Sequence, residues 1–132
     1  MPVDLAKYAP EWVQEFKRCE KWIEDAIEYS HGAFTIESVF EDLLHGGAQL
    51  WPTENAVAIT QIVEYPGKKV MHFFLAGGDL QELEALHDPI EEYARSVGCK
   101  GLSLTGRPGW AKSFLRNRDY VIREVQMYKD IE

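Results

Sequence analysis

The sequence between Lys68 and Ile131 decides the fold, because the apolar patterns of strands and helices alternate along it. It contains, in order, KKVMHFFLA (68–76), GGD (77–79), LQELEALHDPIEEYARSVGC (80–99), KGLSLTG (100–106), GWAKSFLRN (109–117) and DYVIREVQMYKDI (119–131). These segments predict a strand, a glycine turn, an amphipathic helix, a strand, a helix and a final strand. The crossover between the first two strands is long enough for a right-handed strand–helix–strand unit, so these two strands should be parallel.

Two amphipathic helices are predicted before this stretch. From Glu11 to Tyr29, apolar side chains recur every three or four residues between charged ones, as on a helix with one buried face. Thr35 is suited to cap a second, shorter helix, and the pair Gly46-Gly47 is suited to end it.

A hairpin is predicted next. The segment from Ala48 to Trp51 is a short strand that Pro52 interrupts, and Ala56–Glu64 is rich in β-branched residues. The turn at residues 65–68 would join the latter strand to Lys69–Ala76, which makes these two strands antiparallel.

The helix after the glycine turn has a cap and an internal proline. Asp79 is suited as its N-cap, with Glu82 at the reciprocal position of a capping box. Pro89 lies inside the helix and is expected to kink or divide it near His87-Asp88. The whole order predicts one α/β domain over residues 1–132.

The composition is that of a globular protein, with 132 residues of which 45% are hydrophobic and 12% aromatic. No apolar run approaches the roughly 18 residues of a membrane span, and the first residues lack the pattern of a signal peptide. We therefore expect a soluble, cytoplasmic protein with no membrane partner. Cys19 and Cys99 match no ligand spacing, so two reduced and mostly buried thiols are expected.

The net charge of −8 comes from the first half of the chain. Residues 1–64 contain four Lys/Arg and twelve Asp/Glu, whereas residues 65–132 contain ten of each. An acidic first half is a poor surface for nucleic acid, so no such partner is expected. Residues 100–129 carry seven basic and two acidic side chains. This basic segment could meet a small anion or pair with the acidic half.

The order of elements resembles the GNAT superfamily of N-acetyltransferases over nearly the whole chain. The resemblance implies an α/β (α+β) fold, in which a mixed central sheet has two N-terminal helices and a strand–helix–strand–helix–strand second half. The phrases GAQLWP, FFLAGGDLQEL, IEEYARSVGC and GRPGWAKSFLRNRDY are similar to those of small GNAT-like proteins of tailed bacteriophages and prophages. In the superfamily, acetyl-coenzyme A lies in the splay after the first strand of the second half.

The resemblance implies a coenzyme-binding turn. GNAT enzymes hold the coenzyme pyrophosphate with backbone N–H groups of a Q/R-x-x-G-x-G/A loop at a helix N-terminus, where the helix dipole also favours an anion. The Gln or Arg of this motif is absent here, and Asp79 adds a negative charge and can use the helix donors as a cap. The matching positions are Leu75, Ala76, Gly77, Gly78, Asp79 and Leu80.

Candidate catalytic residues are few. The superfamily's tyrosine near the end of the last helix, which protonates the leaving thiolate, aligns with Leu115, which cannot donate a proton. Tyr120 lies close by, in the predicted final strand. Glu64 and His72 are candidates for a general base, although His72 also fits a partly buried structural histidine. The four histidines show no metal-ligand spacing, so no metal is expected.

The segment Gly106-Arg107-Pro108-Gly109-Trp110 is a further candidate surface for a ligand or partner. It joins the C-terminal end of the second parallel strand to a helix, where open α/β sheets place ligands. Arg107 could pair with a phosphate or a partner's carboxylate, and Trp110 could anchor an interface. The alternative is a glycine turn whose tryptophan packs on the sheet.

The final predicted strand, Tyr120–Ile131, has apolar side chains on both faces, and GNAT sheets commonly end with two strands rather than one. An unpaired strand is a place where another chain can add. We therefore expect protein partners, either virion proteins or a second copy that binds through this strand.

Two functions fit the sequence. We favour a GNAT-fold phage or prophage protein that is a non-catalytic binding or virion-associated component, located in the host cytoplasm or the virion. The reason is that the fold pattern is intact whereas two functional motifs depart from the family. The alternative is an active N-acetyltransferase that transfers acetyl from acetyl-coenzyme A, its one implied cofactor, to an amine acceptor.

Overall fold

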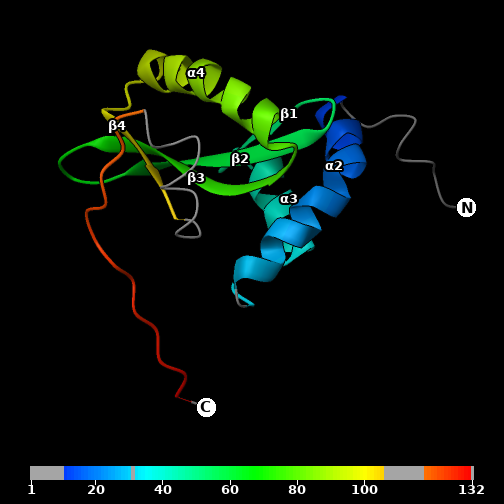
Figure 1. Cartoon of the computed structure of the whole chain (residues 1–132), viewed down its shortest axis with the longest axis horizontal. Coiled ribbons are helices and arrows are strands. Elements are labelled where there is room, and N and C mark those ends of the chain that lie inside the picture. The colour runs from blue at the N-terminus through cyan, green and yellow to red at the C-terminus, as the bar shows by residue number, and fades with distance from the viewer. Residues whose placement is uncertain (1–10, 31, 106–117, 132) are drawn as a thin grey trace, which may run out of the picture.

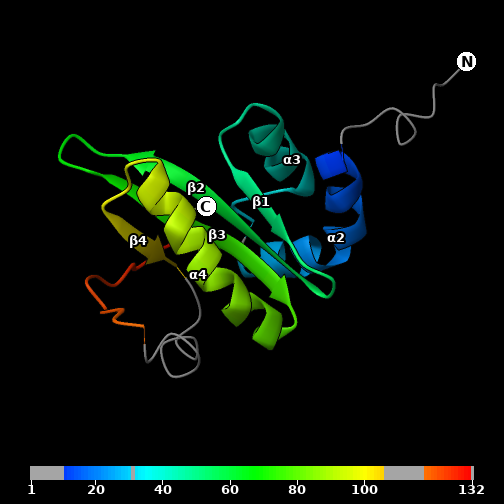
Figure 2. The same cartoon turned by 90° about the horizontal axis from the view of Figure 1, so that it is seen from above.

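A mixed sheet lies between two helical layers in the computed structural model, which describes residues 11–30, 32–105 and 118–131 (Figure 1). Helices α2 (Glu11–Ile27) and α3 (Ile36–Leu44) cover one face, with the 3-10 turn η1 (Glu28–Ser30) between them. Helix α4 (Leu80–Ser96) covers the other face, as the view from above shows (Figure 2). None of the described helices is long and apolar enough to cross a membrane.

The sheet consists of four strands in sequence order. They are β1 (Gln49–Pro52), β2 (Ala56–Glu64), β3 (Lys69–Gly78) and β4 (Gly101–Leu104). β2 pairs antiparallel with both β1 and β3, whereas β4 pairs parallel with β3. The predicted hairpin and the predicted parallel crossover are both confirmed. Pro52 does not interrupt β1 but is its last residue, where it pairs with Val57.

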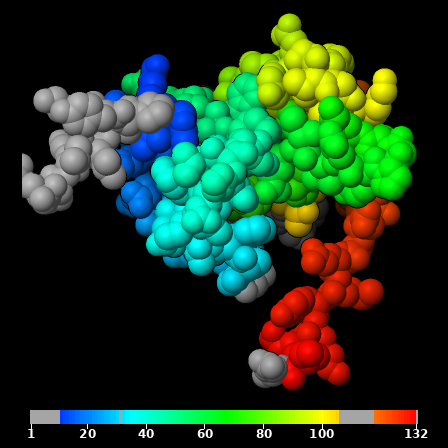
Figure 3. All heavy atoms as spheres, turned by 180° about the vertical axis from the view of Figure 1, so that it is seen from behind, coloured from blue at the N-terminus to red at the C-terminus, as the bar shows by residue number. Residues whose placement is uncertain are grey.

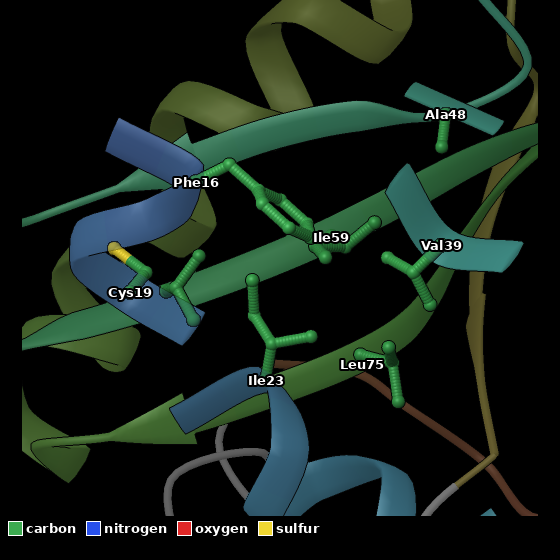
Figure 4. Close-up of a cluster of buried hydrophobic side chains, with 8 residues drawn as sticks. Phe16, Cys19, Ile23, Val39, Ala48, Ile59 and Leu75 are labelled. Carbon is green, nitrogen blue, oxygen red and sulfur yellow. The ribbon is translucent and has the colours of Figure 1, made fainter. Parts of the chain in front are cut away.

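Each face of the sheet buries its own apolar cluster, since neighbouring side chains of a strand point to opposite faces. On the α2–α3 face, Figure 4 shows side chains from both helices and the sheet pointing toward one another. This cluster consists of Phe16, Cys19, Ile23, Val39, Ala48, Val57, Ile59 and Leu75. The α4 face buries Ala56, Ala58, Met71, Leu83, Ile90, Ala94 and Cys99. Both cysteines are free and buried, as predicted.

The helix caps agree with the sequence except at one residue. Thr35 caps α3 reciprocally with Ser38, and the Asp79 carboxylate accepts a hydrogen bond from the N–H of Glu82 at 3.1 Å. The expected return bond from the Asp79 N–H to the Glu82 carboxylate does not form. This N–H donates to the carbonyl of Asn55, and the Glu82 carboxylate accepts from the backbone and side-chain amides of Asn55.

Pro89 does not divide α4, which continues as one helix from Leu80 to Ser96. A proline removes one backbone donor and crowds the carbonyl four residues earlier, but it leaves the other turns of the helix intact. Leu83, Ile90 and Ala94 are buried on either side of it against the sheet. Their packing holds the helix together across the proline.

The final strand expected at residues 120–131 does not form. The chain turns at Arg118-Asp119 and then has neither helix nor strand as far as Ile131 (Figure 1). A strand exists only when its backbone groups pair with a neighbouring strand. The alternating pattern of these residues therefore shows a propensity for strand, but no neighbouring strand in the described part of the chain pairs with them. Arg107 and Trp110, like Leu115, lie outside the described residues.

Candidate functional site

The parallel pairing of β3 with β4 ends beside a bulge in β3. Their last pair is Phe73 with Leu104, but β3 continues to Gly78. In the β2–β3 ladder the register shifts here, which leaves Phe74 without an opposite residue. A bulge bends its strand and increases the local twist, and bulges are frequent beside active sites. We take the place where this pairing ends, which we call the divergence, as the candidate functional site.

The bulge also changes which side chains face each helical layer. Phe73 packs in the α4-side cluster, whereas Phe74 and Leu75 both pack on the α2–α3 side, and Ala76 returns to the α4 side. The Phe74 ring meets the Phe34 ring edge-on at 4.8 Å between centroids. The one extra residue thus reverses which side chains of β3 face each helical layer, at the point where the pairing with β4 ends.

His72 of β3 and Ser103 of β4 contact each other one residue before the pairing of these strands ends. Nδ1 of His72 lies 2.9 Å from Oγ of Ser103, and these residues are opposite each other in the register. Burial lowers the pKa of His72 below its ordinary value, so its ring is neutral at pH 7. A neutral imidazole that is oriented by a hydroxyl can accept a proton. This pair is the chemically most capable group at the divergence among the residues that the structure describes.

The two glycines that end β3 are required by neighbouring backbone. A Cβ on Gly77 would lie 2.7 Å from the carbonyl oxygen of Trp22. Gly78 has a φ of 102°, and a Cβ there would clash with the carbonyl oxygen of Asn55. Close packing against α2 and the start of β2 therefore accounts for both glycines without a ligand.

The first turn of α4 is occupied by the chain's own polar groups. The N–H of Asp79 donates to the carbonyl of Asn55 at 2.9 Å, and the Glu82 carboxylate accepts two bonds of 2.8 Å from Asn55. Hydrogen bonds from Thr53 and Asn55 lower the pKa of Glu82, which keeps its negative charge at this helix start. Two carboxylates, Asp79 and Glu82, thus lie where the anion of the expected coenzyme would be held.

The positive charge of Arg18 acts on Glu82, but the donors of Arg18 are engaged. It donates to the carbonyl oxygens of Thr53 and Glu54 at 2.6 and 2.9 Å, and it pairs with Glu15 at 2.7 Å. These bonds fix the β1–β2 loop to α2. They also form one wall of an open hollow of 860 Å³ lined by Glu11, Trp12, Glu15, Arg18, Leu50, Pro52, Thr53 and Glu54.

The structure separates the other predicted site residues. Leu75 is buried and Ala76 half-buried in the clusters, whereas Leu80 is exposed at the start of α4. Glu64 lies at the hairpin turn, opposite Lys69. Lys69 is the first residue of β3 and Gly78 its last, so Glu64 lies at the other end of the strand from the glycine turn. Tyr120 lies against α4 rather than at the divergence.

A polar cluster around His87 was not foreseen from sequence. Nε2 of this buried histidine lies 2.7 Å from the Tyr120 hydroxyl, and its ring stacks on Phe73. Arg118 donates to Asp88 at 2.6 Å and lies 3.3 Å from Nδ1 of His87. Burial raises the pKa of Tyr120 to about 12, so its hydroxyl stays protonated. The cluster attaches the chain after residue 117 to α4, a contact between segments about thirty residues apart that no local pattern could show.

A metal site was not expected, and the described part of the chain contains no group of three or more His, Cys, Asp or Glu side chains that could hold an ion. Such groups are the usual ligands of Zn²⁺ and of harder cations.

Neither a model of a known protein family nor any curated protein sequence matches the chain. Solved structures do match its fold. An aminoglycoside acetyltransferase from an uncultured soil metagenomic sample, in complex with sisomicin, superposes with a TM-score of 0.62 at 12% identity, over 98% of this chain and 91% of that one. A tetramutant of the BH1408 protein of Bacillus halodurans superposes with a TM-score of 0.61 at 13% identity, over 90% of this chain and 94% of that one.

Glucosamine-6-phosphate N-acetyltransferase from Arabidopsis thaliana matches with a TM-score of 0.55 at 17% identity, over 76% of this chain and 82% of that one. At such low identities the likeness concerns the fold. The chain therefore has the GNAT acetyltransferase-like fold that its order of elements predicted.

Proposed function

We propose that this chain is a GNAT-fold binding component without acetyltransferase activity. One observation carries the proposal: the start of α4, where the coenzyme pyrophosphate would be held, is occupied by Asp79, Glu82 and Asn55 of the chain itself. Coenzyme A carries several negative charges on its phosphates. Two carboxylates at the helix start repel them and already use donors that a phosphate would need.

The proposal extends to a phage or prophage origin and to a place in the virion or the host cytoplasm. This part is supported by the sequence resemblance of GAQLWP and GRPGWAKSFLRNRDY to small GNAT-like phage proteins. The partners would be other proteins, for which a catalytically silent domain offers a rigid surface. The presence of portal, capsid or tail genes beside this gene, and of the chain in purified particles by mass spectrometry, would support it. Flanking host metabolic genes would contradict it.

An active N-acetyltransferase is the second candidate, and the divergence of β3 and β4 favours it. β3 has a bulge at Phe74, where its pairing with β4 ends, and the His72–Ser103 pair provides a neutral base beside it. This base would take the proton from an amine acceptor that attacks the thioester carbonyl of acetyl-coenzyme A. The matching structures include two that are named as acetyltransferases of amine-bearing sugars or aminoglycosides.

Isothermal titration with acetyl-coenzyme A separates the two candidates. For a binding component we expect no heat at millimolar coenzyme and no release of free thiol in the presence of amines. Micromolar affinity together with thiol release would overturn the proposal. Loss of that release in His72→Gln, with binding retained, would assign the base.

A charge-removing variant tests the reason for the absent binding. Asp79→Asn with Glu82→Gln keeps two hydrogen-bonding side chains but removes two negative charges from the helix start. If these charges exclude the coenzyme, the variant should gain measurable affinity. Glu92→Gln removes a charge from an exposed position elsewhere on α4 and should gain none. Equal behaviour of the two variants would show that the carboxylates at the helix start are not the cause.

A further inference from the structure

The last described residues, 121–131, form an arm that projects from the body of the molecule (Figure 3). Six large apolar side chains of the arm are 72–91% exposed: Val121, Ile122, Val125, Met127, Tyr128 and Ile131. Adjacent exposed apolar side chains in this number mark an interaction surface. The arm also has strong strand propensity, because β-branched and aromatic residues are frequent in it and it contains neither Gly nor Pro.

Among the described strands, β4 lies at an edge of the sheet, near the start of the arm (Figures 1 and 2). β4 ends the strand order, and β3 is its one neighbour within the described ranges. Its outer N–H and C=O groups can therefore pair with an added strand. Leu102 of β4 packs in the α4-side cluster, so an added strand would extend that core.

The base of the arm is fixed to α4 and directs the arm outward. Tyr120 is bonded to His87, which is 4% exposed, and Arg118 is paired with Asp88. Asp119 between them has a φ of 64°, which turns the chain sharply. After this anchored turn the arm runs away from the sheet (Figure 3). Within the described residues, the chain thus has an unpaired segment with strand propensity and, at β4, an edge that no other described strand pairs with.

We propose that two copies of this chain exchange their arms, each arm adding as a strand to the β4 edge of the other copy. Each copy supplies one arm and one β4 edge, so a two-fold symmetric pair can pair both arms and form a closed dimer. A standard interface buries about 800 Å² per partner, and the six exposed apolar side chains of each arm would contribute to such an area. The exchange does not depend on whether the chain binds the coenzyme.

The charge of the arm favours a protein partner, such as a second copy, over nucleic acid or an anionic membrane. Arg123 and Lys129 are balanced by Glu124 and Asp130, so the arm is neutral. A neutral arm is not repelled or attracted by the net charge of another copy, and its binding rests on apolar contacts and backbone pairing. Nucleic acids and anionic membranes select segments with an excess of Lys and Arg, which this arm lacks.

Light scattering and hydrogen exchange on the full chain test the exchange over a range of protein concentrations. We expect a dimer whose formation slows amide exchange both in residues 121–131 and in residues 101–104. A monomer at high concentration would overturn the proposal, whether its arm is protected or not. A dimer with protection in the arm but not in β4 would also overturn it, because the arms would then pair with each other.

Two matched variants identify the contact. Val125→Asp places a charge on the arm, and Leu44→Asp places the same charge on an exposed apolar position of α3. We expect Val125→Asp to weaken dimerisation at least tenfold, and Leu44→Asp to leave it unchanged. Circular dichroism should show the parent spectrum for both, and Met127→Asp should repeat the result of Val125→Asp. A dimer that is indifferent to both arm variants would exclude the arm from the interface.

Discussion

At the scale of single residues, the turn from β3 to α4 depends on two glycines that neighbouring backbone atoms fix in place. Gly78 combines a positive φ with a backbone carbonyl oxygen, that of Asn55, which a Cβ would meet in a clash. We expect Gly78→Ala to lower the free energy of unfolding by about 1–3 kcal/mol from backbone strain alone. Urea denaturation measures this difference.

Gly67 provides the control for this prediction. It lies in the β2–β3 turn without a positive φ, and a Cβ added to it would meet no atom within 4 Å. Gly67→Ala should therefore change stability by no more than about 0.5 kcal/mol. Equal effects of the two substitutions would mean that the packing against Asn55 does not govern the turn.

Two histidines should make stability depend on pH. Burial, together with the nearby Arg118, lowers the pKa of His87, and burial lowers that of His72, whereas both take their ordinary values near 6.5 in the unfolded chain. The unfolded chain thus binds protons first as the pH falls. The free energy of unfolding should therefore be highest above about pH 6.5 and should decline as the pH falls below this value.

His87→Gln tests how much of this loss of unfolding free energy comes from His87. The variant lacks one of the two titrations, so the slope of unfolding free energy against pH should become shallower, with a remainder from His72. His45→Gln, at an exposed histidine, is the control. Chemical denaturation at half-unit steps of pH measures both. An unchanged slope in His87→Gln would show that His87 does not titrate differently in the folded state.

At the scale of elements, the sequence predicted those parts of the fold that depend on local pattern. The β-branched run of β2 and the turn after it predicted the hairpin, and the length of the crossover predicted a parallel β4. The bulge at Phe74 could not be predicted, because it depends on the register between two strands. The arm shows the converse case, in which a strand pattern lacks the neighbour that would make it a strand.

The candidate site was predictable only in part for the same reason. The glycine turn and the cap at Asp79 were visible because their residues are adjacent in sequence. The pairing of His72 with Ser103 and the engagement of Glu82 by Asn55 join residues 31 and 27 positions apart. Such contacts follow from the parallel register and from the packing of α4, which no short motif encodes.

The cap of α4 yields a prediction at this scale. Asp79→Ala removes the acceptor for the N–H of Glu82 and should lower stability by about 1 kcal/mol. Asp79→Asn should lower it much less, because Asn caps helices equally well. The midpoint of urea unfolding compares the two. A similar loss in both variants would show that the charge matters rather than the hydrogen bond.

At the scale of the whole molecule, stability should depend on protein concentration if the arms are exchanged. A dimer that forms only from folded chains is stabilised by mass action, so its melting temperature rises with concentration. A chain that ends at Tyr120 keeps the anchor on His87 but lacks the arm. Its melting temperature should not vary with concentration.

The same truncation separates exchange from a structural role of the arm within one copy. Since the apolar side chains of the arm are 72–91% exposed, their removal should leave the intrinsic stability of the monomer unchanged. At high dilution, the full and shortened chains should therefore melt at the same temperature, and they should diverge as the concentration rises. A shortened chain that melts earlier even at high dilution would mean that the arm stabilises its own copy, because contacts with a second copy vanish there.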